Sequence, residues 1–88
     1  MRGEERKMKY RYIQDPGHGW LEVPYAEVRA AGIAAEISQY SYRKTGMVYL
    51  EEDCDMGLFL SARNLDDRNI ESVFQDPCYI RGYPRFHS

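Results

Sequence analysis

The amino-acid sequence predicts one small α+β domain, in which a mixed, mostly antiparallel sheet carries two short helices on one face. Five short segments are rich in aromatic and β-branched residues, and two further segments have the composition or spacing of helices. They follow one another in the order β-β-α-β-β-α-β, so strands outnumber helices. A chain of 88 residues can bury one core and no more.

The first half of the chain is expected to form two strands and a helix. Residues 8–13 alternate aromatic and charged side chains, which is typical of a strand. Turn-forming residues at 15–19 separate this strand from a second one at 20–23, which ends at Pro24 because proline cannot donate to a sheet ladder. Pro24 also suits the first turn of a helix that Gly32 terminates.

A hairpin is expected next. Residues 40–43 and 47–51 are strand-like, and the three-residue connection 44–46 between them ends in glycine. Residues 56–63 have the spacing of a helix that either Asp53 or Asp55 caps at its N-terminus.

The rest of the chain is expected to supply one more strand and a tail. Asn64 ends the second helix, and residues 70–74 form the last strand. The aromatic tail at 79–86 is either an edge strand or a strap across the sheet. Trp20 and Phe59 are the expected core aromatics.

Charge and targeting features narrow the class of protein. Twelve basic against fourteen acidic side chains give a net charge of −2, which favours neither a strongly basic nucleic-acid binder nor a heavily acidic nucleic-acid mimic. The leader at 1–7 is charged and is expected to be flexible, so the domain spans 8–88. With no apolar signal-peptide core and no transmembrane stretch, we expect a cytoplasmic protein without a membrane partner. Cys54 and Cys78 are expected to be free, buried thiols.

Four carboxylates, at Glu51, Glu52, Asp53 and Asp55, form the first candidate site. Such a run could face a partner protein or hold a cation, or it could simply end a strand and cap a helix. The spacing fails the calcium-loop pattern, because Gly57 comes one position early and no closing glutamate follows. We therefore expect no metal and no cofactor, and treat the run as a candidate protein-binding patch.

Eight tyrosines are the most unusual feature of the composition. Tyr40 and Tyr42 share one face of their predicted strand, and neighbouring strands would extend this face into a tyrosine-rich surface. Such a surface suits protein recognition or a homodimer, and it could also stack bases. Tyrosine used as core filler explains the same residues equally well.

Basic residues provide an alternative site. Arg11, Arg43, Lys44 and Arg81 could contact phosphates beside the tyrosines, although a solvated edge explains them too. An enzyme that uses His18 with Asp53 or Asp55 is the least favoured class, because no acid, base and nucleophile stand at an interpretable spacing. We expect no catalytic residues.

Four segments together resemble a family of small uncharacterised proteins associated with phages, prophages and plasmids. They are residues 17–24 (GHGWLEVP), 37–42 (ISQYSY), 49–55 (YLEEDCD) and 80–83 (IRGY). The resemblance spans residues 10–85 and implies an origin in a mobile element, but it carries no activity. Short proteins of such elements often inhibit host machinery stoichiometrically, as anti-CRISPR proteins do.

The sequence therefore favours a non-catalytic interaction protein of a mobile element that binds and blocks a host protein or ribonucleoprotein complex of the defence machinery. A small nucleic-acid-binding accessory protein is the alternative.

Overall fold

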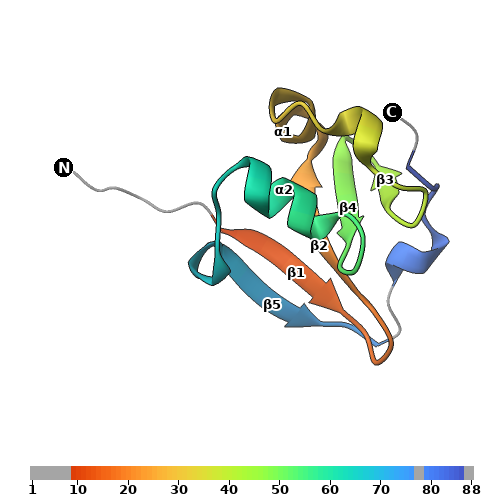
Figure 1. Cartoon of the computed structure of the whole chain (residues 1–88). Coiled ribbons are helices and arrows are strands. Elements are labelled where there is room, and N and C mark those ends of the chain that lie inside the picture. Colours follow the sequence, from red (N-terminus) through yellow and green to blue (C-terminus); the bar gives the residue numbers. More distant parts are fainter. Residues whose placement is uncertain (1–8, 77–78, 87–88) are drawn as a thin grey trace.

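The computed structural model describes residues 9–76 and 79–86, and it shows the predicted α+β class (Figure 1). The elements are β1 (Tyr10–Gln14), β2 (Gly19–Pro24), α1 (Tyr25–Ala30), β3 (Tyr42–Lys44), β4 (Met47–Glu51), α2 (Met56–Ala62) and β5 (Ile70–Phe74). Short 3-10 helices lie at Ala34–Glu36, Asp67–Asn69 and Tyr79–Gly82. The order of strands and helices is the predicted one. The expected leader at 1–7 and Cys78 lie outside the described residues.

The five strands form one sheet in the order β3-β4-β2-β1-β5. β1 and β5 run parallel, and the other neighbouring pairs are antiparallel, as a mixed sheet requires. β2 lies between β1 and β4, so the first strand does not neighbour the hairpin. The two edges of the sheet are β3 and β5.

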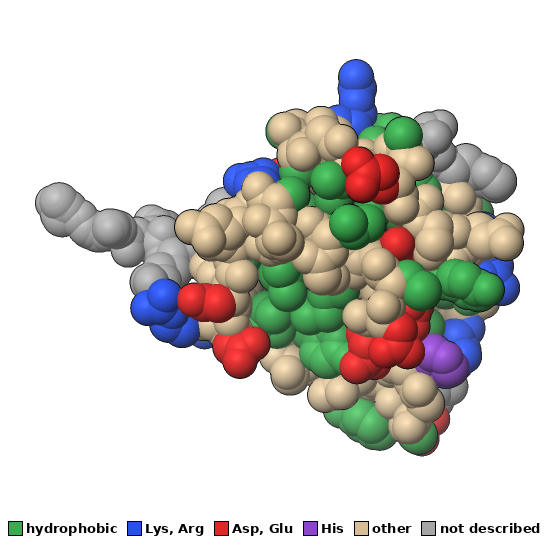
Figure 2. Space-filling view, viewed as in Figure 1, with side chains coloured by type: hydrophobic (Ala, Val, Ile, Leu, Met, Phe, Trp, Pro, Cys, Tyr) green, Lys and Arg blue, Asp and Glu red, His purple; other side chains and the backbone are tan. Residues whose placement is uncertain are grey.

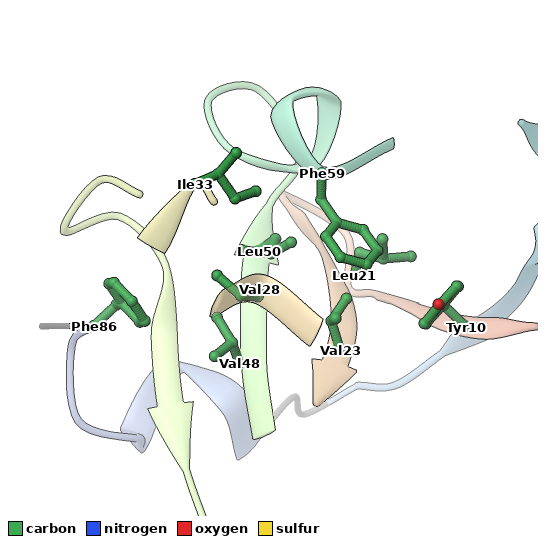
Figure 3. Close-up of a cluster of buried hydrophobic side chains, with 9 residues drawn as sticks. All are labelled: Tyr10, Leu21, Val23, Val28, Ile33, Val48, Leu50, Phe59 and Phe86. Atoms are coloured by element: carbon green, nitrogen blue, oxygen red, sulfur yellow. The ribbon is translucent and has the colours of Figure 1, made fainter. Parts of the chain in front are cut away.

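The larger core lies between the sheet and the two helices (Figure 3). Its buried side chains are Tyr10, Leu21, Val23, Val28, Ile33, Val48, Leu50, Phe59 and Phe86. Val28 comes from α1 and Phe59 from α2, which confirms that both helices cover one face. Phe59 packs edge-on against the Tyr10 ring, and the Tyr10 hydroxyl donates to Glu27 Oε1 of α1 at 2.6 Å.

A second core lies on the opposite face and includes the predicted core residue Trp20. Trp20, Ile13, Tyr42 and Tyr49 are covered there by Ile80 of the tail. The tail then runs beside the edge strand β3, where Arg85 forms an antiparallel bridge with Tyr42. The tail thus acts both as a strap and as an edge partner.

Four described residues have a left-handed backbone conformation, and they lie where the sequence predicts helix ends or the hairpin turn. Gly32 follows α1 with φ +76°, and Asn64 follows α2 with φ 57°. Thr45 and Gly46 both have positive φ and form a two-residue hairpin turn, which matches the twist of the strands. The predicted three-residue connection is therefore wrong by one residue, and β3 begins at Tyr42 rather than at Tyr40.

Candidate functional site

A pocket of about 360 Å³ opens where four segments meet, in the size range of small-ligand sites. The segments are the β1–β2 turn, the residues before β3, the acidic loop after β4, and the tail. The lining side chains are His18, Trp20, Tyr40, Tyr42, Glu51, Asp53, Cys54, Arg81 and Arg85. The pocket thus joins aromatic rings, carboxylates and guanidinium groups from distant parts of the sequence.

Asp15 organises one wall of the pocket. Its Oδ1 accepts hydrogen bonds from the backbone N–H groups of Gly17 and His18 at 2.9 and 2.8 Å, which closes the β1–β2 turn. Arg81 of the tail binds the same carboxylate through Nε at 2.7 Å and Nη2 at 3.1 Å. The Arg81 guanidinium holds the pKa of Asp15 far below its usual range, with help from the two backbone donors.

Trp20 forms the floor beside this wall and is only 2% exposed. The His18 ring stacks on it with centroids 5.9 Å apart, and the Arg81 guanidinium lies 5.2 Å from the centroid of the indole. Within the described part of the chain, the indole N–H of Trp20 has no hydrogen-bond acceptor. A buried donor without an acceptor is unfavourable, so an acceptor that reached it would stabilise the site.

The acidic loop forms the opposite wall. Glu51 is 7% exposed, and its Oε1 accepts the backbone N–H groups of Asp53 and Cys54 at 3.0 and 2.9 Å. Cys54 is free and exposed, so the expectation of a buried thiol is wrong for this residue. Desolvation and a hydrogen bond with Glu51 raise the pKa of Cys54. The sulfur is therefore a protonated thiol near neutral pH rather than a nucleophilic thiolate.

Asp55 does not take part in the pocket. It is 1% exposed and accepts hydrogen bonds from the backbone N–H and hydroxyl of Ser38 and from the hydroxyl of Ser41. It occupies the N-cap position of α2, yet its side chain caps no backbone N–H of the helix. Its carboxylate instead ties the segment before β3 to α2.

The predicted patch of four carboxylates is wrong for Asp55, which is buried and bound to two serines. Glu51 is also mostly buried, but it lines the pocket. Glu52 and Asp53 are exposed, as the prediction requires. A hydrogen bond with Glu52 adds to burial in raising the pKa of Tyr12 to about 12. Figure 2 shows acidic side chains between the histidine and a central hydrophobic area. Residues of the acidic loop line both the pocket and a second hollow.

The tyrosines do not share one open surface. Tyr10 and Tyr12 lie on the helix side of β1, whereas Tyr42 and Tyr49 belong to the opposite core beneath the tail. The expected tyrosine-rich face does not form, because β2 separates β1 from the hairpin and the tyrosines of β1 and of the hairpin lie on opposite faces of the sheet. Tyr42 is buried in the pocket floor, and Tyr40, at 57% exposed, stands at its rim.

The four predicted phosphate contacts are likewise dispersed. Arg11 is bound to Glu22 at 2.9 and 3.2 Å, and Arg81 is bound to Asp15. Arg43 stacks over Tyr25 on the side of α1. Lys44 lies over Tyr83 of the tail, and of the four basic residues only Arg81 lines the pocket.

The sequence did not indicate that Trp20 or Cys54 lines a pocket, and it suggested Arg85 only as a tail residue that could contact phosphate or stack bases. Trp20 was expected only as a core residue, and Cys54 was expected only as a free, buried thiol. Arg85 Nη1 donates to the Gln39 carbonyl at 3.0 Å and stacks over Tyr42. Nothing local in the sequence shows that the tail returns to this place, although the alternation of arginine and aromatic residues at 81–86 indicates that it packs.

The described residues contain neither a metal-binding cluster nor a membrane-spanning helix. No three His, Cys, Asp or Glu side chains gather in a way that could hold a metal ion there. No helix in residues 9–76 and 79–86 is both long and apolar enough to cross a membrane.

Comparison with known proteins gave no match: no family model, no curated protein and no solved structure is significantly similar to this chain.

Proposed function

We propose that this chain is a non-catalytic interaction protein that captures a protein partner at the pocket. The observation that carries the proposal is the combination of Tyr40 and Arg85 at the opening with the unpartnered indole N–H of Trp20 below. Tyrosine, tryptophan and arginine are the residues that most often dominate binding energy at protein interfaces. The indole nitrogen is buried, so a backbone or side-chain oxygen of the partner would supply the acceptor that Trp20 lacks only where binding moves a covering side chain aside.

The chemistry of the pocket supports binding over catalysis. In the pocket, the Cys54 thiol has a raised pKa, and the Nδ1 atom of His18 lies 2.9 Å from Arg81 Nη2. Outside the pocket, Asp55 is bound to two serines. None of these groups has the arrangement of an activated nucleophile and its base.

We propose further that the partner belongs to a host defence complex and that binding inhibits it. The resemblance to small phage and plasmid proteins supports this part of the proposal. The dispersed and internally bound basic residues give direct nucleic-acid contact less support.

The test is an affinity pull-down of the tagged protein from a nuclease-treated bacterial lysate with an active defence system, read by mass spectrometry. We expect one stoichiometric protein partner that Tyr40→Ala loses and Tyr79→Ala keeps. The two tyrosines are both exposed, but only Tyr40 lines the pocket.

Two outcomes would contradict the proposal. Retention of the partner by both tyrosine variants would place its binding away from the pocket. Recovery of nucleic acid without nuclease, and of nothing with it, would replace the protein partner with nucleic acid.

A further inference from the structure

β5 is an open sheet edge. One side of β5 pairs with β1. Directly after the last residue of β5, the N–H of Gln75 also donates to the Gln14 carbonyl of β1, at 2.8 Å. Because N–H and C=O groups alternate in direction along a strand, those of Ser72 and Phe74 point away from the sheet. No strand of the described chain lies beyond β5. These outward groups are therefore free to pair with an added strand.

The side chains at this edge suit an added strand. A groove of about 320 Å³ lies next to β5 on the helix side, lined by Tyr12, Met56, Ile70 and Ser72 with Glu52 and Asp67 at its rim. Phe74, at the end of the strand, is 64% exposed. An added strand would cover alternate apolar side chains of β5.

The charged side chains around β5 indicate which kind of strand would bind there. Residues 66–76 contain four carboxylates, at Asp66, Asp67, Glu71 and Asp76, against the single guanidinium of Arg68, which is bound to Asp66. Glu52 adds a further carboxylate at the groove. A second copy paired at β5 would bring these carboxylates against their own counterparts. A basic segment would meet them with complementary charge.

We propose that the β5 edge binds an extended, basic segment of a partner protein as a sixth strand. Backbone hydrogen bonds to Ser72 and Phe74 supply affinity, and the acidic rim supplies selectivity. Edge strands are normally protected by charged side chains, proline or a bulge, and residues 70–74 carry one charge, at Glu71, and no lysine or proline. This surface is separate from the pocket, so it can bind even if the pocket has no ligand.

The test is an NMR titration of the ¹⁵N-labelled full chain with three blocked octapeptides. One alternates lysine with valine, one alternates glutamate with valine, and one alternates lysine with proline. We expect the lysine–valine peptide alone to shift the Ser72 and Phe74 amides and to slow their hydrogen exchange. Proline removes every second N–H donor and favours the polyproline II conformation over a strand, while the charge stays the same, so that peptide reports mainly the electrostatic contribution.

Variants sharpen the assignment. Ser72→Pro removes one outward N–H without removing a bond to β1, and it should weaken lysine–valine binding at least tenfold, whereas Ser72→Ala should bind normally. Reversal of charge at Asp67 and Asp76 to lysine should also weaken binding severalfold and flatten its salt dependence. This double variant carries the test if Ser72→Pro does not fold.

Several results would overturn the proposal. Equal binding of the glutamate–valine peptide would remove the charge selectivity, and binding that survives in the edge variants would remove the site. Shifts confined to the pocket residues would place the peptide there instead. Concentration-dependent changes at β5 without peptide would show that a second copy occupies the edge.

Discussion

The two edges of the sheet differ in how the chain treats them. At β3 the tail supplies hydrogen bonds: the Arg43 N–H donates to the Pro84 carbonyl and the Phe86 N–H to the Ser41 carbonyl, each at 2.9 Å. Phe86 then enters the core beneath the helices. At β5 the chain provides no such cover in the residues that the structure describes, and Phe74 is exposed. The β3 edge is covered by the tail, whereas the β5 edge is available to pair with another strand.

The tail that covers the β3 edge also enlarges the small hydrophobic core of this chain of 88 residues. The tail covers Trp20 with Ile80 on one face and reaches the opposite core with Phe86. In doing so it also completes the pocket, because Arg81 and Arg85 come from the same segment. The same segment therefore closes the β3 edge and completes the candidate site.

The largest predicted effect comes from replacing a phenylalanine by alanine at each of the two edges and comparing the losses of stability. Phe86→Ala should lower the free energy of unfolding by about 3–5 kcal/mol, because Phe86 is 4% exposed and leaves a cavity. Phe74→Ala should lower it by less than about 0.5 kcal/mol. Urea denaturation measures both changes.

A control is needed because the whole domain has only about 5–15 kcal/mol of stability. Phe86→Leu keeps most of the buried volume and should fold even if Phe86→Ala does not, with a smaller loss. Equal losses from Phe86→Ala and Phe74→Ala would contradict the comparison, since they would mean that the β5 edge is also covered.

The strength of ion pairs provides the second test. The pair between Asp15 and Arg81 joins the tail to the β1–β2 turn across 66 positions, and its carboxylate is mostly buried. Asp15→Asn should lower the free energy of unfolding at pH 7 by about 1 kcal/mol. The pair of Asp66 and Arg68, beside β5, is local and exposed, so Arg68→Gln should cause no measurable change.

The pH dependence of this effect has a defined sign. Folding lowers the pKa of Asp15, so its contribution is complete above the unfolded pKa of about 4 and disappears as the pH falls through the folded value. Denaturation curves of wild type and Asp15→Asn should therefore converge in acid. A difference that persists unchanged at pH 2 would show that the aspartate does not act through its charge.

Local patterns predicted most of the fold. Pro24, Gly32 and Asn64 mark element boundaries because their backbone preferences act within a few residues, and all three occur where expected. The hairpin was one residue off because Thr45, a β-branched residue, adopts the left-handed conformation that the sequence pattern assigned to Gly46 alone.

The pocket was less predictable because its parts meet only through tertiary structure. Glu51 and Asp55 look like surface carboxylates in the sequence, and only the folded chain shows that backbone N–H groups and serines surround them. The tyrosine-rich face failed for a related reason. Sequence order does not reveal that β2 inserts between β1 and β4.

The smallest predicted effect is a stabilisation of the β3–β4 hairpin, which includes the closed edge strand β3. Thr45 has φ 52°, a conformation that asparagine tolerates much better than a β-branched residue. Thr45→Asn should therefore raise the free energy of unfolding by about 0.5–1 kcal/mol, and hydrogen exchange should slow in β3 and β4 more than in β5. Lys44→Asn, one position earlier in strand conformation, should give no gain. A gain in stability of the same size from Lys44→Asn would mean that the left-handed conformation at Thr45 is not the cause. The stability of the closed β3 edge would then come from the tail and not from the turn.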